Sequence, residues 1–419
     1  MTKTQTTLGE YRELLNSPAR KIFLGVLLNA MGSGLTMALL LVYLHDIRGF
    51  SNSFGALLLS FEAAVGILVA GPIGALVDRF GPKRILMIGL AIDTVATYLW
   101  SLTTTQAMAM VVGTMIAFAT TMSWPPQSVM LTRIVPEENR QKAFAINFML
   151  LNLGLGLGGM LAAIIITPGD AASFEMLYRI DAATFLLYLA LVASLKYDFS
   201  LSKEDKEAQS AGGYREVFRD RKFVLLAIGS LATLTFGYAS LSTGLPILVT
   251  QYLDLSPKWL GVILGANTIA IVLLQVPVLK LIGHRRKFWV IASVGGIFAV
   301  SWAMVGAASL LIGAAAALVV AASQVVFAFG EMVWSPTAPT LINELAPPHL
   351  QGRYNAIGSL QWSVSAVIGP AIAAAFFSRD LLGEWLGLMT VGSLLPVIMF
   401  VALARSVDRA SATKELVEN

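Results

Sequence analysis

Cysteine is absent from this 419-residue sequence, so disulfide bonds, thiol catalysis and cysteine-ligated metals are excluded. Histidine is scarce, and the 3 histidines, His45, His284 and His349, lie too far apart to form a ligand pattern. The sequence also lacks the Gly-x-x-x-x-Gly-Lys-Ser/Thr loop that holds nucleotide phosphates, and any Ser-His-Asp grouping. We therefore predict no enzyme, no ATP-driven motor, no cofactor and no metal site.

Charged side chains are also few. They make up 13% of the sequence, against about 25% in a typical soluble domain. Hydrophobic residues make up 56%, and the mean hydropathy is +0.74. Such a composition predicts a large surface in contact with a lipid bilayer. The net charge of +4 is small, and the basic cytoplasmic loops of a membrane protein account for it, so we expect no nucleic-acid partner.

Long apolar runs dominate what remains. A membrane-spanning helix needs about 20 mostly apolar residues. The sequence offers twelve such segments, at 20–45, 53–77, 83–103, 107–134, 142–167, 176–196, 222–250, 257–282, 287–306, 310–340, 354–378 and 384–404. We therefore predict an all-α integral membrane protein with twelve transmembrane helices.

The distribution of lysine and arginine predicts the orientation of these helices. If both termini are cytoplasmic, 25 of the 29 cations fall on the cytoplasmic side, and only Arg48, Arg179, Lys258 and Arg379 lie outside. Such a bias sets membrane topology. We predict a multi-pass protein of the inner (plasma) membrane, divided into a cytoplasmic N-terminal segment, a six-helix half, a cytoplasmic linker, a second six-helix half and a cytoplasmic tail, at 1–19, 20–196, 197–221, 222–404 and 405–419.

An internal repeat supports the division into halves. Trp124-Pro125-Pro126 is echoed 210 residues later by Trp334-Ser335-Pro336. Gln141 and Gln351 correspond at the same offset, and a proline-containing turn follows each tryptophan motif. A duplication with six spans in each half is the plan of carriers whose substrate site lies between the halves.

Residues 71–84, at the end of the second apolar segment, carry a charged turn. This stretch resembles the loop between the second and third helices of the major facilitator superfamily, whose pattern is Gly-x-Leu-x-Asp-Arg-x-Gly followed by basic residues. The residues on or beside that pattern are Gly74, Leu76, Asp78, Arg79, Gly81, Lys83 and Arg84. The resemblance implies a two-half carrier that works by alternating access.

The charged turn suggests a conformational latch, which we assign to Gly74, Asp78, Arg79, Gly81 and Arg84. A carboxylate is stabilised at a helix N-terminus. In the family plan the eleventh span begins nearby, around Arg353. We expect Asp78 to contact that helix start while the cavity faces outward, and Arg79 and Arg84 to hold neighbouring carboxylates. The counterpart loop of the second half, at 281–287, keeps a glycine and several cations but has no aspartate.

Three carboxylates lie well inside predicted spans: Glu331, Asp93 and Glu62. Placing a carboxylate at the bilayer centre costs a few kcal/mol, so a functional role is the first hypothesis. We rank Glu331 first for proton coupling, then Asp93 and Glu62. The resemblance to drug-exporting relatives, some of which carry a carboxylate on span ten, favours Glu331. A structural contact between helices is the alternative for each.

Other polar or aromatic side chains within spans are candidates for lining a substrate cavity. They are Asn29, Asn152, Asn267, Gln275, Gln324, Trp334 and Gln361. Hydrogen bonds between helices explain most of the polar ones equally well.

The sequence is similar to the drug:proton antiporter group, with two departures. The glycine-rich run 154–159 ends in Gly159-Met160, where the antiporter motif has Gly-Pro, and span four has no arginine at its middle. We expect a monomeric, proton-coupled exporter of amphipathic, drug-like molecules. A metabolite facilitator or symporter and a lipid or lysophospholipid exporter remain alternatives, and a receptor or enzyme is a more remote one.

Overall fold

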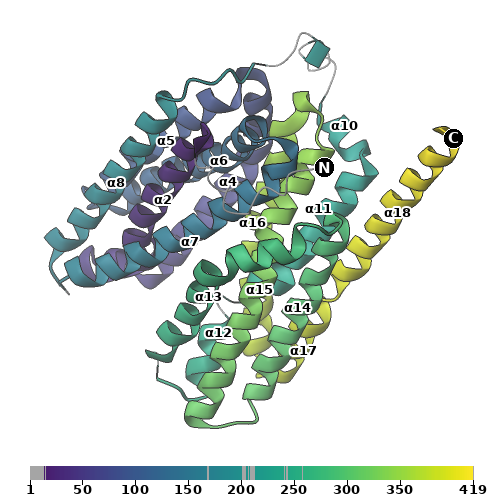
Figure 1. Ribbon diagram of the computed structural model, residues 1–419. Helices are drawn as coiled ribbons and strands as arrows, with labels where there is room; N and C mark the ends of the chain where they lie inside the picture. Colours follow the sequence, from purple (N-terminus) through teal and green to yellow (C-terminus); the bar gives the residue numbers. More distant parts are fainter. Residues whose placement is uncertain are drawn as a thin grey trace. The chain divides into compact units, whose positions relative to one another are not determined.

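The structure is a computed structural model that describes residues 14, 16–167, 169–200, 204, 205, 207, 213–239, 241, 244–256 and 258–418. Within these residues every regular element is helical (Figure 1), which confirms the predicted all-helical class. Most of the predicted N-terminal segment 1–19 and the middle of the predicted linker 197–221 lie outside the described residues.

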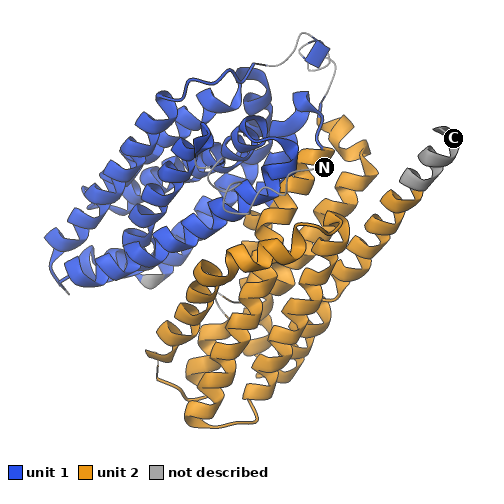
Figure 2. Ribbon diagram, in the orientation of Figure 1, with its two compact units in different colours: residues 1–213, 346–360 blue, residues 214–345, 361–419 orange. Residues whose placement is uncertain are grey.

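The chain divides into two compact units (Figure 2). Residues 1–213 and 346–360 form the first unit, and residues 214–345 and 361–419 form the second. Helix α16 (Gln351–Phe377) therefore begins in the first unit and ends in the second. The two six-helix halves predicted from the sequence, at 20–196 and 222–404, have other boundaries than these units and stay a prediction.

The first unit is a bundle of long helices. Its elements are α2 (Ala19–Thr36), η1 (Met37–Leu39), α3 (Leu40–Val42), η2 (Tyr43–Ile47), α4 (Asn52–Phe80), α5 (Pro82–Trp100), α6 (Gln106–Ile134), η3 (Glu137–Asn139), α7 (Arg140–Ile165), α8 (Ala171–Ala193), η6 (Pro348–Leu350) and the start of α16. Helix α2 packs against α7 and α8, α5 packs against α6 and α8, and α4 packs against α6.

Glycines bring α2 and α7 into close contact. A Cβ atom added to Gly34 would lie 2.5 Å from the carbonyl oxygen of Leu155, and one added to Gly154 would lie 2.7 Å from that of Leu27. Small residues at such positions let two helix backbones approach. The glycine-rich run 154–159 is therefore accounted for by helix packing.

The second unit is also a helical bundle. Its elements are α10 (Tyr214–Arg219), α11 (Arg221–Thr233), η4 (Leu234–Ala239), α12 (Gly244–Ile247), η5 (Leu248–Tyr252), α13 (Lys258–Ile282), α14 (Lys287–Ala308), α15 (Gly313–Leu345), the remainder of α16, α17 (Leu382–Gly392) and α18 (Leu395–Glu418). Helix α14 packs against α15, α17 and α18, and α13 packs against α15. The buried rings of Trp302 and Trp385 meet edge to face, 5.2 Å apart.

Ten helices in the described part of the chain are long and apolar enough to cross a membrane. They coincide with ten of the twelve predicted segments. The predicted span 83–103 corresponds to α5, which carries three charged residues, Lys83, Arg84 and Asp93. The predicted span 222–250 is broken into α11, η4, α12 and η5, with residues between them that are not described. The structure thus supports a multi-pass membrane protein, and the count of twelve stays a prediction.

The repeated proline motifs lead into the same order of elements. After α6 ends at Ile134, the 3-10 turn η3 leads into α7. After α15 ends at Leu345, the 3-10 turn η6 leads into α16. Gln141 and Gln351, which match at the repeat offset, are both buried in the first turns of the helices that follow.

Candidate functional site

Asp78 lies in the last turn of α4 and is 4% exposed. Its carboxylate accepts hydrogen bonds from the backbone nitrogens of Gly352 at 2.5 Å and Arg353 at 3.2 Å. The Nη1 atom of Arg353 also donates to it, at 2.9 Å. The first backbone N–H groups of a helix have no partner within the helix and favour an anion. Asp78 therefore caps the start of α16.

Two glycines make this contact possible. A Cβ atom on Gly352 would lie 2.5 Å from the carbonyl oxygen of Gly74 and 2.6 Å from Oδ1 of Asp78, so α4 and α16 meet only if position 352 has no side chain. Gly81 has φ of 86°, a conformation that L residues rarely adopt, and it ends α4 directly before Pro82 starts α5.

The cations of the charged turn behave differently from the aspartate. Arg79 and Arg84 are exposed, and the guanidinium of Arg79 lies 5.3 Å from the ring centre of Phe80. Among the described residues, neither arginine forms an ion pair with a carboxylate. Lys83 instead donates to the carbonyl oxygens of Ala193 at 3.1 Å and Leu195 at 2.8 Å, where it caps the C-terminus of α8.

Arg133 belongs to the same end of the first unit, and no sequence pattern predicted its contacts. Its Nε atom donates to Oε1 of Gln351 at 2.9 Å, and its Nη2 atom donates to the carbonyl oxygen of Pro348 at 3.1 Å. Its Nη1 atom donates to the carbonyl oxygen of Phe199 at 2.7 Å. A cavity of about 550 Å³ adjoins these groups. Arg133 thus ties the start of α16 to the chain that follows α8.

The second unit holds Glu331 within α15, where it is 9% exposed. The Nδ2 atom of Asn267, on α13, donates to Oε2 of Glu331 at 2.5 Å and to the carbonyl oxygen of Gln324 at 3.3 Å. The structure therefore brings together three of the predicted residues. The described residues include no cationic partner for Glu331.

Tyr238, which no sequence pattern singled out, lies beside Glu331. Its buried hydroxyl interacts with the carboxylate of Glu331. Its ring meets those of Phe298, Phe327 and Trp362 edge to face, with centres 5.5, 5.3 and 4.9 Å away. Trp362 is 47% exposed and so is the accessible side of this aromatic group.

The other cavity candidates lie in varied surroundings. Gln275 donates to the carbonyl oxygen of Met332 at 3.2 Å, and Asn152 donates to that of Phe148 in its own helix at 3.0 Å. The buried amide nitrogens of Asn29 and Gln361 have no hydrogen-bond partner in the described part of the chain.

Trp334, another cavity candidate, lies on α15 and is buried. Its buried ring packs near that of Phe400, with centres 6.4 Å apart.

Carboxylates of the first unit form a second group. Asp93, on α5, is 3% exposed, and the hydroxyl of Ser123 donates to it at 3.5 Å. Asp181, on α8, is equally buried, accepts from the Thr36 hydroxyl at 2.8 Å and interacts electrostatically with Asp93. Glu62, on α4, lies against α6, where a Cβ atom on Gly113 would be 2.5 Å from its Oε1.

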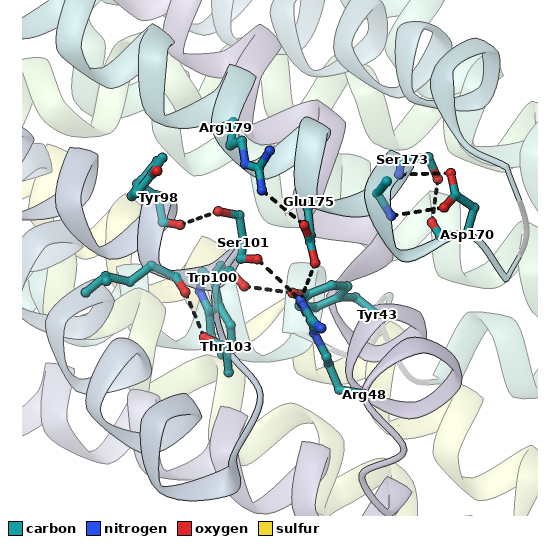
Figure 3. Close-up of polar contacts among 12 residues, drawn as sticks. Tyr43, Arg48, Tyr98, Trp100, Ser101, Thr103, Asp170, Ser173, Glu175 and Arg179 are labelled. Atoms are coloured by element: carbon teal, nitrogen blue, oxygen red, sulfur yellow. Dashed lines mark hydrogen bonds and ion pairs between the residues drawn. The ribbon is translucent and has the colours of Figure 1, made fainter.

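Sequence reasoning overlooked Asp181 because it placed the start of the sixth span at 176. Helix α8 begins at Ala171, since the side chain of Asp170 accepts from the backbone nitrogens of Ala172 and Ser173 and caps it (Figure 3). Asp181 consequently lies three turns inside the helix rather than near its end. The Asp170-x-x-Ser173 spacing is the signal that could have located the helix start.

A network of polar side chains lies at the end of the first unit where α8 begins (Figure 3). The Nη2 atom of Arg48 donates to Oε1 of Glu175 at 2.8 Å, to the Tyr43 hydroxyl at 2.7 Å and to the carbonyl oxygen of Ser101 at 3.3 Å. Burial alone would lower the pKa of Arg48, but hydrogen bonds to Tyr43 and Glu175 raise it. The network joins the segment after α3, the end of α5 and the first turns of α8.

Comparisons with known proteins agree with this architecture. Residues 22–370 match the Major Facilitator Superfamily. A Na(+), Li(+), K(+)/H(+) antiporter of Planococcus maritimus is 23% identical, covering 71% of this chain and 75% of that protein. The quinolone resistance protein NorA of Staphylococcus aureus is 22% identical over 62% of this chain and 66% of that protein.

Solved transporters share the fold. The human organic anion transporter MFSD10 superposes with a TM-score of 0.70 at 16% identity, covering 91% of this chain and 98% of that one. A bacterial homologue of the iron transporter ferroportin superposes with a TM-score of 0.77 at 14% identity, covering 93% and 99%. With a family match across most of its length, the chain belongs to the Major Facilitator Superfamily of membrane transporters.

Proposed function

We propose that this protein is a secondary active transporter that exports amphipathic small molecules in exchange for protons. The observation that carries the proposal is Glu331, a carboxylate buried in an apolar helix, held by Asn267 at 2.5 Å and without a cationic partner among the described residues. Such a group is expensive in a membrane unless it binds something that neutralises it. A proton-coupled carrier needs a carboxylate of this kind.

The surroundings of Glu331 favour an amphipathic cargo. The partly exposed ring of Trp362 stacks edge-on against Tyr238, which in turn lies beside Glu331. Aromatic faces next to a carboxylate suit molecules that combine an apolar ring with a positive charge. The similarity to a quinolone resistance protein is consistent with a drug-like cargo, and the similarity to a cation/proton antiporter is consistent with proton coupling.

Asp78 supplies the conformational part of the proposal. It holds the first residues of α16 within the first unit, whereas the later residues of the same helix belong to the second unit. Breaking this contact would free the start of a helix that both units share. We infer that the contact acts as a latch, closed while the cavity faces outward and released as the carrier opens inward.

Transport in proteoliposomes tests the function. We expect an imposed pH gradient to drive uptake of a fluorescent lipophilic cation by the wild type, and Glu331→Gln to uncouple that uptake from the gradient. Glu138→Gln, which removes an exposed carboxylate in η3, is the matched control and should transport normally. Transport that ignores the gradient in the wild type would refute proton coupling. Lysolipids and polar metabolites tested in the same vesicles would identify the alternative cargoes.

We also propose twelve spans with both termini in the cytoplasm of a cell whose inner (plasma) membrane holds the protein as a monomer. The absence of cysteine makes this directly testable, because a single introduced cysteine has no background. In intact bacterial cells a membrane-impermeant maleimide should label Ser256→Cys and not Ser200→Cys, both of which are exposed positions. The reverse labelling pattern would overturn the orientation.

A further inference from the structure

Helix α10 is the first element of the second unit, and the function proposed above does not use it. It leads through Asp220 into α11 (Figure 1). Asp220 has an extended backbone, with φ of −71° and ψ of 93°, and its side chain caps α11, so the two helices are not one continuous helix. The predicted span 222–250 begins at Lys222, which places α10 just outside that span.

Exposed positive charge gathers where α10 meets α11. The exposed cations are Arg215, Arg219, Arg221 and Lys222. None of the four forms an ion pair with a carboxylate among the described residues. Two other cations of the same unit, Arg286 and Lys287, do pair with carboxylates. The charge at the junction of α10 and α11 is therefore available to an external anion.

The side chains of α10 are sorted around its axis. Successive residues of an α-helix are turned by about 100°, so residues four apart share a face. The rings of Tyr214 and Phe218 accordingly lie side by side, with centres 6.4 Å apart, and the two arginines of α10 follow them around the axis. Val217 is fully buried and marks the side that faces the protein. Glu216 falls on the side opposite the rings, so the aromatic and basic faces adjoin each other without an acidic residue between them.

The ring of Phe218 is 64% exposed. Contact with water does not account for an aromatic ring beside two guanidinium groups. At a membrane surface the same arrangement is favourable, because the ring enters the boundary between headgroups and acyl chains while the guanidinium groups bind headgroup phosphates. Anionic lipids of the cytoplasmic leaflet attract clusters of cations next to a span. Membrane topology alone would account for the cations but not for the ring beside them.

We propose that α10 and the first turn of α11 form a binding surface for anionic phospholipid headgroups, made of Arg215, Phe218, Arg219, Arg221 and Lys222. A lipid is favoured over a free anion because Phe218 can contribute only to a partner that has an apolar part. The surface is the first part of the second unit after the linker, so a bound lipid holds this end of the linker at the membrane. Its place in the cytoplasm rests on the orientation proposed above, whereas headgroup binding itself does not depend on transport.

Titration of a fluorescent phosphatidylglycerol into the purified full-length protein, in micelles of a neutral detergent, tests the proposal by fluorescence anisotropy. We expect tighter binding than for a fluorescent phosphatidylcholine with the same acyl chains, and weaker binding at high salt. Inorganic phosphate at matched ionic strength should not displace the lipid. Micelles have no sides and need no pH gradient, so failure of this surface is distinguishable from failure of the orientation or of proton-coupled export.

Matched variants locate the charge that binds the lipid. Arg215→Gln combined with Arg219→Gln should weaken phosphatidylglycerol binding about tenfold, because each cation near an anionic lipid surface contributes to affinity. Lys280→Gln combined with Arg285→Gln removes the same charge from exposed positions at the end of α13 and in the loop after it, and binding should be unchanged.

A second pair of variants tests the aromatic ring. Phe218→Ala keeps every charge and should weaken lipid binding severalfold, whereas Phe118→Ala, which removes a partly exposed ring from α6, should not. Equal affinity of the wild type for the two phospholipids, displacement of the lipid by inorganic phosphate, or equal effects of the matched variants would overturn the proposal.

Discussion

Replacing Asp78 with asparagine should release the start of α16. The carboxylate accepts hydrogen bonds from the backbone nitrogens of Gly352 and Arg353 and from the guanidinium of Arg353. Asparagine has the same shape, and its oxygen can still accept from Gly352. Its amide group, however, would point hydrogen atoms at the remaining donors, and the negative charge beside Arg353 would be lost.

The magnitude follows from the hydrogen bonds that are removed. Hydrogen bonds to a charged group contribute about 1.5–3 kcal/mol each, and Asp78 is buried enough that water screens them little. Losing the two hydrogen bonds from Arg353 while gaining a donor–donor conflict should destabilise the closed contact by about 3 kcal/mol. That is roughly a hundredfold shift in the equilibrium between closed and open forms.

The natural absence of cysteine provides the assay. Ala356, on the part of α16 that belongs to the first unit, is 1% exposed. A cysteine there should react slowly with a water-soluble maleimide while the contact is closed, and its reaction rate should rise with the open fraction. In the Asp78→Asn background we expect that rate to increase by one to two orders of magnitude.

Asp170→Asn is the matched control. Asp170 also accepts from two backbone nitrogens at a helix start, but on α8 and away from α16. Asparagine is an equally good helix cap, so the reactivity of the cysteine at position 356 should not change. Equal labelling rates in the wild type and Asp78→Asn backgrounds would refute the reasoning, because the carboxylate would then not hold α16 closed.

Two further substitutions follow from the same packing arguments. Gly352→Ala should raise the same labelling rate, because its Cβ atom would lie 2.5 Å from a carbonyl oxygen of α4, whereas Gly296→Ala, with open space around it, should not. Arg48→Met should lower the thermal unfolding midpoint, because it leaves the partly buried carboxylate of Glu175 with only its exposed partner and costs about 1–3 kcal/mol; an unchanged midpoint would show that the Arg48 network does not stabilise the first unit.

Hydropathy predicted the helices because lipid-facing helices are apolar all round, and this signal is local in sequence. Hydropathy located helices least well where charged residues or irregular helical turns interrupt an apolar run. Helix α5 carries three charged residues, and the segment 222–250 contains two stretches of π-helix, η4 and η5. Cap residues fix helix ends, and overlooking the Asp170 cap displaced the predicted start of α8 and hid Asp181.

The residues of the candidate sites likewise divide into those with a local sequence signal and those defined by long-range contacts. Asp78 could be selected from sequence because its charge, the glycine turn after it and its place between apolar runs are all local features. Arg133 could not, because its partners Gln351 and Pro348 are more than 200 residues away and are backbone or amide oxygens without a sequence signature. Tyr238 could not be selected from sequence for the same reason, because only the fold brings it next to Glu331, which lies on another helix.

The corresponding loops of the two units make their contacts through side chains of opposite charge. In the first unit a carboxylate, Asp78, caps the start of α16, which continues into the second unit. In the second unit the loop between α13 and α14 has no aspartate, and its cations bind carboxylates of the same unit: Arg286 pairs with Asp408 at 2.6 Å and Lys287 with Glu344 at 2.5 Å. Those ion pairs can stabilise the second unit by itself, but they hold no helix that belongs to the first. The Asp78 contact, in contrast, acts on a helix that both units share, as does the hydrogen bond from Arg133 to Gln351. A latch built on Asp78 would therefore be one-sided, and losing it should change the conformational equilibrium more than the stability of either unit.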